Sequence, residues 1–194
     1  MRRIISVVVV FTVLWIGYLV WPFYDLRQFA KAVEAGDVAE VSRRVDLPRL
    51  REALMQQLVD SYVVQTKPAT GSLRRSAAVA IVEPAAAKFM TADALTELLR
   101  VGWPRTILAE RPPEAVDISV AQLGNAWALF AGSDYWFDRF DVNVPPSVPE
   151  DKAFGLRFRL THWHWRLTSI RLPAHIRVLL ADEVVKTRKA QASP

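Results

Sequence analysis

An unbroken apolar run near the N-terminus constrains this chain more than any other feature. Ile4 to Trp21 comprises 18 consecutive residues without a charged side chain. As an α-helix rising 1.5 Å per residue, the run is about 27 Å long, which is close to the hydrocarbon thickness of a bilayer. Arg2 and Arg3 precede it. The pattern predicts one transmembrane helix. The lipid bilayer is its expected partner along Ile4 to Trp21, and Trp21 is expected at the membrane interface.

The charges on either side of this run predict its orientation. The positive-inside rule places the N-terminus in the cytoplasm, although Arg27 and Lys31 on the other side weaken the bias. We therefore expect residues 1–22 to be an uncleaved signal-anchor in the inner membrane, followed by a periplasmic, extracytoplasmic domain. A cleaved signal peptide is the alternative, but Tyr18 to Trp21 is too bulky for a small-residue cleavage site.

The composition limits what the remainder can be. The 194 residues are 52% hydrophobic and 23% charged, so long disorder is excluded. The chain has no cysteine, which excludes a disulfide scaffold, a Cys-ligated metal and thiol catalysis, and it has only three histidines. We expect no cofactor and no metal. We expect a single domain over residues 23–185 and a flexible tail over residues 186–194.

The first half of the domain has helical patterning. Apolar residues recur at three- and four-residue spacing after Pro22, and Gly36 ends that helix. Asp37 is expected to cap a second, short helix, and Thr91 another that Gly102 terminates. The expected helices cover residues 23–35, 38–45, 47–66, 76–90 and 92–101.

The second half changes to a period of two. Alternation predicts strands over residues 116–120 and 127–131, joined by a Gly124-Asn125 hairpin turn, and further strands over 136–144, 154–160 and 163–172. Phe140 and Phe158 are expected in the core, and residues 174–185 form a closing helix. Helices followed by strands predict an α+β fold: a transmembrane helix, a helical segment, and a curved antiparallel sheet covered by helices.

The helical half resembles a known family. A helix ends in Ala-Gly-Asp37, a second short helix follows, and then comes Val45-Asp-Leu-Pro-Arg-Leu-Arg51. This order is similar to a family of uncharacterised membrane-anchored bacterial proteins, domain of unknown function 2939. That family also has a hydrophobic N-terminus, a Phe-rich strand like residues 138–144 and an ending like residues 165–173. The resemblance implies a membrane-anchored envelope protein, and it implies no activity.

The last hairpin departs from the pattern of this family. The family leads us to expect a Gly-containing turn before the final strand, but this chain has Thr161-His-Trp-His164 there. More loosely, a helix–Ala-Gly-Asp–helix start followed by an antiparallel sheet resembles the nuclear-transport-factor-2-like cone fold. That fold hosts enzymes, binding pockets and scaffolds, so it implies little about chemistry.

The candidate pocket residues lie in the predicted sheet. A concave sheet can line an apolar pocket with aromatic side chains, and Trp127 and Trp136 are the candidates, with Asp138 as a partly buried carboxylate beside them. Paired carboxylates can also perform acid–base chemistry, which extends the cluster to Asp134 and Asp141. The structural alternatives are packing in the core for the aromatics, and pairing with Arg139 or a backbone amide for Asp138.

The remaining polar features favour no specific chemistry. His162 and His164 flank Trp163, an arrangement that can bind a metal but is also typical of an exposed hairpin turn. His175 is expected on the surface. The net charge is +5, but basic and acidic residues are interspersed on the helices, so we expect no nucleic-acid partner. Two groups of basic residues can contact anionic lipid or increase the solubility of the protein: Arg74-Arg75 and Lys186/Arg188/Lys189.

The sequence thus favours a binding or interaction module over an enzyme. No catalytic site is assigned, because no nucleophile motif or phosphate loop is present. Expected partners are the bilayer and either an envelope protein or a small apolar ligand. The alternative is a small hydrolase- or isomerase-like envelope enzyme that uses Asp138 or the His162/His164 pair, and a third class is a structural subunit of a membrane complex.

Overall fold

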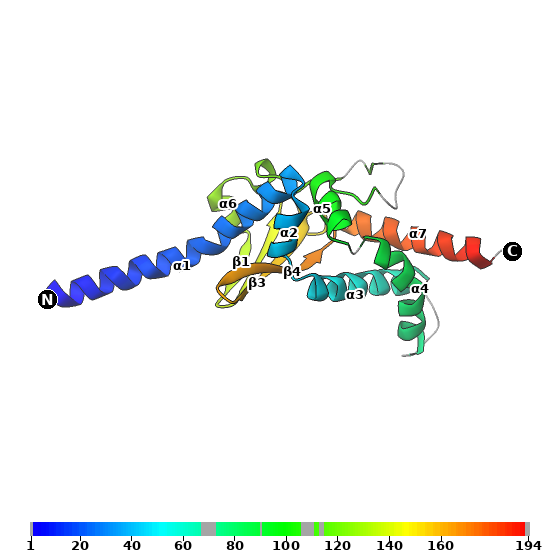
Figure 1. The fold of residues 1–194 in the computed structure, drawn as a ribbon, viewed down its shortest axis with the longest axis horizontal. Coiled ribbons are helices and arrows are strands. Elements are labelled where there is room, and N and C mark those ends of the chain that lie inside the picture. The colour runs from blue at the N-terminus through cyan, green and yellow to red at the C-terminus, as the bar shows by residue number, and fades with distance from the viewer. Residues whose placement is uncertain (1, 67–72, 90, 106–110, 113–114, 193–194) are drawn as a thin grey trace.

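The fold is α+β, as predicted, with helices first and a sheet afterwards (Figure 1). This computed structural model describes residues 2–66, 73–89, 91–105, 111–112 and 115–192. Its elements are α1 (Arg2–Ala35), α2 (Val38–Arg44), α3 (Leu47–Thr66), α4 (Leu73–Phe89), α5 (Ala92–Val101), the 3₁₀ turn η1 (Ala121–Leu123), α6 (Ala126–Ala131), β1 (Ser133–Trp136), β2 (Arg139–Val144), β3 (Phe154–Thr161), β4 (His164–Arg171) and α7 (Ala174–Ala192). The molecule is elongated, with the N- and C-termini at opposite ends (Figure 1).

Helix α1 has two parts with different surroundings. Its first part projects away from the domain, and the side chains from Ile4 to Gly17 are exposed (Figure 1). Among the described helices, α1 is long and apolar enough to cross a membrane. Its second part packs on the domain, where Leu26, Phe29 and Val33 are fully buried. The domain boundary predicted at residue 22 falls inside this continuous helix.

Pro22 leaves one carbonyl of α1 without its helical partner. Proline has no N–H, so the carbonyl oxygen of Tyr18, four residues earlier, receives no i→i−4 hydrogen bond. The hydroxyl of Tyr135 on β1 donates to this oxygen at 3.3 Å. In return, the hydroxyl of Tyr18 donates to the carbonyl oxygen of Phe137. The proline thus creates an acceptor in the helix that the sheet uses for docking.

The helix ends follow the predicted capping chemistry. The side chain of Asp37 accepts from the backbone N–H of Glu40 at 2.9 Å, and Thr91 accepts from Ala94 at 3.2 Å. Gly102 has a φ of +80°, and a Cβ there would lie 2.3 Å from the carbonyl oxygen of Val116. Only glycine fits this position without displacing backbone.

The four strands form an open antiparallel meander in the order β1-β2-β3-β4. One face packs on the second part of α1, where Phe23 meets Phe140 edge-on at 4.8 Å and Phe29 meets Phe158 at 5.8 Å. Phe140 is fully buried and Phe158 is 2% exposed, which confirms both predicted core positions. The opposite face carries the polar side chains.

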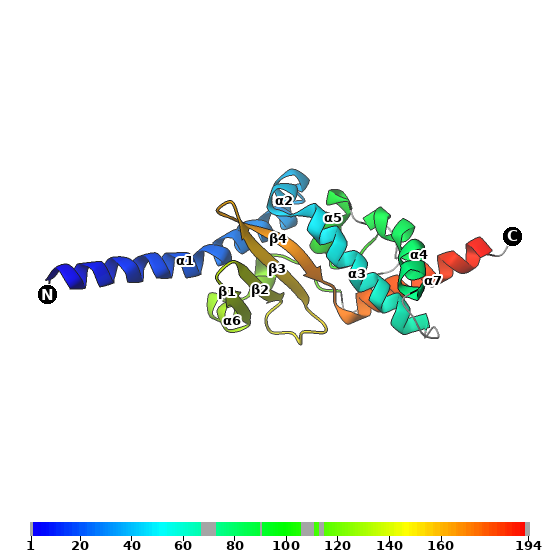
Figure 2. The same cartoon turned by 90° about the horizontal axis from the view of Figure 1, so that it is seen from below.

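Helix α3 lies along the β4 edge of the sheet and also packs on α7 (Figure 2). Gln57 on α3 connects it to the strand: its Nε2 donates to the Ile170 carbonyl at 2.6 Å, and its Oε1 accepts from the Leu172 N–H at 3.1 Å. Just before the start of α3, the N–H of Asp46 donates to the carbonyl oxygen of Leu167 on β4 at 2.8 Å. These bonds fix the end of β4, from which α7 begins.

The predicted hairpin at Gly124-Asn125 is wrong. Residues 116–120 pair with no strand, and the N–H of Ile118 instead donates to the carbonyl of Leu99 at the end of α5. Asn125 caps α6, since its Oδ1 accepts from the Ala128 N–H at 2.7 Å. Residues 127–131 are therefore helical.

The strand predicted over residues 136–144 is also wrong, because it contains a hairpin. Trp136 on β1 pairs with Arg139 on β2, and Phe137-Asp138 is the two-residue turn between them. The closing helix α7 extends to Ala192, beyond the predicted end at residue 185. The segment expected as a flexible tail is thus helical backbone over residues 186–192, while residues 193–194 lie outside the described chain.

Candidate functional site

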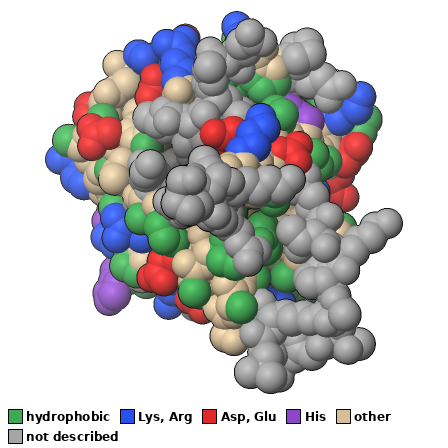
Figure 3. Space-filling view, turned by 90° about the vertical axis from the view of Figure 1, so that its right-hand side faces the viewer, with side chains coloured by type: hydrophobic (Ala, Val, Ile, Leu, Met, Phe, Trp, Pro, Cys, Tyr) green, Lys and Arg blue, Asp and Glu red, His purple; other side chains and the backbone are tan. Residues whose placement is uncertain are grey.

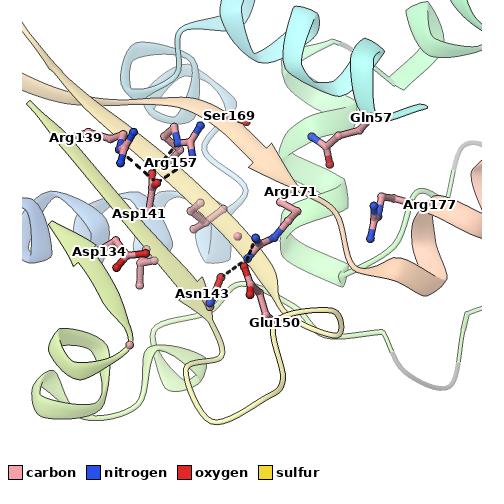
Figure 4. Close-up of a pocket in the computed structure, with 14 residues that line it drawn as sticks. Gln57, Asp134, Arg139, Asp141, Asn143, Glu150, Arg157, Ser169, Arg171 and Arg177 are labelled. Carbon is pink, nitrogen blue, oxygen red and sulfur yellow. Dashed lines mark hydrogen bonds and ion pairs between the residues drawn. The ribbon is translucent and has the colours of Figure 1, made fainter. Parts of the chain in front are cut away.

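The polar face of the sheet forms a groove of about 570 Å³ (Figure 4). Alternation along β2 and β3 turns apolar side chains to the core and polar ones to this face. Gln57 of α3 and Arg177 of α7 complete the lining beyond the β4 edge (Figure 4). Its charged residues are Asp134, Arg139, Asp141, Glu150, Arg157, Arg171 and Arg177.

Asp141 holds two of the arginines in the middle of the groove. It lies opposite Arg157 in the β2–β3 register, and the two form a bidentate pair with Nε–Oδ1 at 2.8 Å and a second bond at 3.0 Å. Arg139 approaches the same carboxylate at 3.5 Å. The hydrogen bonds to Asp141 raise the pKa of Arg157. The two guanidinium groups are thus held in fixed orientations on the sheet surface.

A second cluster lies at the end of the groove near α7. Arg171 donates to Asn143 Oδ1 at 2.8 Å and forms an ion pair with Glu150 (Figure 4). Its side chain lies across Gly155 on β3, where an added Cβ would come within 2.9 Å of Arg171 Nε. The absence of a side chain at Gly155 therefore makes room for this guanidinium group.

Three arginine Nε atoms of the groove are buried without a hydrogen-bond acceptor in the described part of the chain. They belong to Arg139, Arg171 and Arg177, although the Nε of Arg139 lies 3.5 Å from Asp141 Oδ2 in an ion pair. A buried donor that lacks an acceptor costs about 1–3 kcal/mol, and more when it is charged. Arginine forks match carboxylate and phosphate oxygens. The groove therefore presents donors suited to an anionic ligand.

The predicted pocket residues do not line this groove, and only two of them come together. Trp136 and Asp138 line a smaller hollow of about 210 Å³ with Arg139 and Arg159. Asp138 accepts from Arg159 at 2.9 Å, and its side chain is 54% exposed, so the expected partial burial is not seen. Trp127 lies on α6 and is 75% exposed.

The acids grouped in the sequence separate in the structure. Asp134 and Asp141 face each other across β1 and β2, whereas Asp138 lies in the turn at the end of that hairpin. His162 and His164 lie at the exposed β3–β4 turn, as the structural alternative predicted, and His175 is half-buried rather than on the surface. Within the described residues, no group of three His, Cys, Asp or Glu side chains is arranged to hold a metal ion.

Sequence reasoning missed the groove although part of its signal was visible. Arg157 and Arg159 alternate with buried phenylalanine and leucine, which places them on the outer face of a strand. Arg171 and Arg177 are separated by a strand end and a proline, so only the folded chain brings them into the same groove as Arg157. The useful signal was an arginine at the outward positions of successive strands.

Comparison with known proteins supports the predicted family. Residues 11–98 match the family described as Protein of unknown function (DUF2939), which confirms the resemblance seen in the sequence over this segment. The match runs from α1 to α5 and ends before the sheet, so every residue that lines the groove except Gln57 lies outside it. No curated protein and no solved structure matches the chain. The looser nuclear-transport-factor-2-like resemblance stays a prediction.

Proposed function

We propose that this protein is a membrane-anchored, extracytoplasmic binding module without catalytic activity, whose arginine-lined groove holds a small anionic ligand. The observation that carries the proposal is the set of three buried Nε donors around one groove, those of Arg139, Arg171 and Arg177. A carboxylate or phosphate group in the groove would pair with the guanidinium groups to which these donors belong.

The arrangement of charges supports a ligand that is small and anionic. Asp141 and Glu150 already bind Arg157 and Arg171, which orients the guanidinium groups without removing their outward donors. Arg177 makes no side-chain hydrogen bond or ion pair with the described residues. It is thus the cation that a ligand gains most from contacting.

The proposed location depends on α1. Its exposed apolar part, preceded by Arg2 and Arg3, fits a signal-anchor in the inner membrane with the domain on the periplasmic side. A reporter fused after Pro194 tests this: alkaline phosphatase should be active there. Activity of a cytoplasm-only reporter at the same position would refute the orientation.

A binding role fits the side chains better than catalysis does. Asp138, the candidate acid or base, is ion-paired with Arg159 at the rim of the smaller hollow. His162 and His164 lie in an exposed turn. Replacing all three by alanine should leave the phenotype of cells that produce the protein unchanged. If the variant folds normally but its cells show the phenotype of cells that lack the protein, the enzyme alternative is favoured.

Ligand binding can be tested with the full chain in detergent micelles. Isothermal titration with pyrophosphate and with citrate probes phosphate and carboxylate recognition separately. We expect binding that weakens with added NaCl, because salt screens exposed charges. Arg177→Gln should weaken it at least tenfold, and Gly155→Ala should weaken it by displacing Arg171.

The matched control is Arg100→Gln, since Arg100 is an exposed arginine on α5, outside the groove lining. It should bind both probes like the unmodified protein. The proposal fails if neither probe binds at millimolar concentration, or if Arg100→Gln and Arg177→Gln weaken binding equally.

A further inference from the structure

The two hairpin turns of the sheet meet α1 where its apolar run ends. The ring of Phe137, in the β1–β2 turn, lies 5.7 Å from that of Tyr18. The ring of Trp163, in the β3–β4 turn, stacks on Trp21 at 6.3 Å with an interplanar angle of 12°. The strand directions thus bring both turns to the same end of the domain, beside the emerging helix.

This end of the sheet exposes large aromatic side chains. Trp136 is 65% exposed, Phe137 is 76% and Trp163 is 74%, and we call these three residues the aromatic collar. Exposed apolar patches of this kind mark interaction sites, and tryptophan is enriched at the membrane–water interface. At the opposite end, the described side chains of both charge signs are interspersed with apolar ones (Figure 3).

The backbone conformation of the β3–β4 turn disfavours a bulky residue such as Trp163. His162 and Trp163 have φ angles of +50° and +63°. Two-residue turns with positive φ favour Asn and Gly, and a bulky residue in this region is uncommon. Strained positions persist where the side chain has a role. The turn presents an indole to the outside at a position that glycine would occupy more easily.

The level of the collar along α1 matches a membrane interface. If Ile4 to Trp21 spans the hydrocarbon, Tyr18 and Trp21 lie at its outer boundary, about 4.5 Å apart along the helix axis. Phe137 and Trp163 contact these same two residues. Behind them, Arg159 and Arg166 lie opposite each other in the β3–β4 register, on the polar side of the sheet.

We propose that the aromatic collar inserts into the headgroup region of the leaflet from which α1 emerges, and seats the domain against the lipid surface. This inference rests on the membrane anchor of the proposed function but not on the anion groove. The occupant is lipid, because the collar continues the apolar surface of the anchor helix. A second copy of the chain or another protein covering the collar is an outcome that the test separates.

The chain contains no cysteine, so single-cysteine variants give site-specific labels in the full-length protein. Phe137→Cys and Trp163→Cys, labelled with an environment-sensitive fluorophore, are reconstituted in vesicles of phosphatidylethanolamine and phosphatidylglycerol. Lipids spin-labelled near the headgroup or deep in the acyl chain serve as quenchers. Both collar positions should show at least twofold quenching, stronger with the shallow spin label.

Two matched positions make the result decisive. Val64→Cys replaces a 76% exposed apolar residue near the end of α3, far from the collar, and should stay unquenched (Figure 2). Leu14→Cys lies in the anchor and should be quenched most by the deep spin label. Far-UV circular dichroism confirms that each variant is folded.

The outcomes separate the two proposals. If Leu14 is quenched and the collar positions behave like Val64, the anchor stands and the collar proposal is overturned. If the collar labels are shielded from water but not quenched by lipid, protein covers them and the proposal is again overturned. If Leu14 itself is not quenched, the membrane anchor fails together with the location in the proposed function.

Discussion

The hydrogen bond between Tyr135 and α1 gives a sharp test of how the sheet is joined to the anchor helix. Tyr135→Phe removes the hydroxyl that donates to the Tyr18 carbonyl, and Pro22 prevents any helical N–H from replacing it. Burial and the hydrogen bond with Tyr18 raise the pKa of Tyr135, so the hydroxyl remains a donor through the neutral range. The bond should therefore contribute throughout that range.

The expected loss follows from the type of group left behind. A typical hydrogen bond contributes about 0.5–1.5 kcal/mol, and an unsatisfied buried acceptor costs about 1–3 kcal/mol. Because the Tyr18–Tyr135 contact is only part-buried, we expect Tyr135→Phe to lower the free energy of unfolding by about 1–2 kcal/mol. With a urea m-value of about 2 kcal/mol/M, the midpoint falls by about 0.5–1 M.

The proline provides an internal check on the reasoning. In a Pro22→Ala background, the new N–H of residue 22 can donate to the Tyr18 carbonyl, so Tyr135→Phe should cost less than half as much. Urea unfolding of the full chain in nanodiscs, followed by far-UV circular dichroism, measures all four proteins of this double-mutant cycle. Tyr24→Phe, at a 60% exposed position on the same helix, is the control and should change little. An equal cost of Tyr135→Phe in both backgrounds would refute the link to the proline.

Three further predictions concern the domain. Phe140→Ala should lower the free energy of unfolding by about 3–5 kcal/mol, whereas Trp136→Ala, at an exposed position, should cost below about 1 kcal/mol in the same urea melts; similar losses would contradict the assignment of faces. Gly102→Ala should cost at least about 2 kcal/mol because its Cβ would clash with backbone, and a thermal melt like that of the unmodified protein would exclude this constraint. Glu40 has a pKa below its ordinary value because Arg44 and Arg43 bind it, so its contribution to stability is present near neutral pH and is lost as the pH falls through the lowered pKa. Glu40→Gln should therefore lower the free energy of unfolding at pH 7 but not at strongly acidic pH. A difference that does not depend on pH would argue against the ion pairs.

Local chemistry was sufficient to predict the helical half. Asp37 and Thr91 cap helices through their own side chains, and Gly102 ends one because of its positive φ. Each of these interactions spans three or four residues, so the sequence contains both partners. The predicted core positions Phe140 and Phe158 were also right, since strand alternation alone places them on one face.

The secondary-structure predictions were wrong where a residue type is compatible with two local structures or where a turn lacks its usual residues. Asn125 is favoured in a hairpin turn and at a helix N-cap alike, and what decides is the bond from Ile118 to Leu99, seven residues or more away in the chain. The turn at Phe137-Asp138 contains neither Gly nor Asn, so the strand pattern runs through it. In both cases tertiary contacts override the local preference.

The groove could not be predicted because it depends on strand register. Asp141 and Arg157 become partners only when β2 and β3 align residue by residue, and a slip of β3 by one position would turn Arg157 to the core, away from Asp141. Arg177 arrives from α7, whose start is fixed by the bonds of Gln57 to the end of β4. No local sequence pattern specifies which strand residues pair or where α7 begins relative to the sheet.

The same register separates the α7 end of the groove from the aromatic collar along the sheet, whereas Arg139 lies at the collar end of the groove. Residues that pair near the hairpin turns, such as Arg159 with Arg166, lie at the end beside α1, whereas Gly155 pairs with Arg171 at the other end of β3 and β4. Successive residues in a strand advance about 3.3 Å, so the four positions from Gly155 to Arg159 place these ends about 13 Å apart. A domain seated on lipid through its aromatic collar would therefore hold Arg171 and Arg177 away from the headgroups, where a soluble anion can reach them. For this reason, substitutions at Arg177 should leave the lipid quenching of Trp163→Cys unchanged.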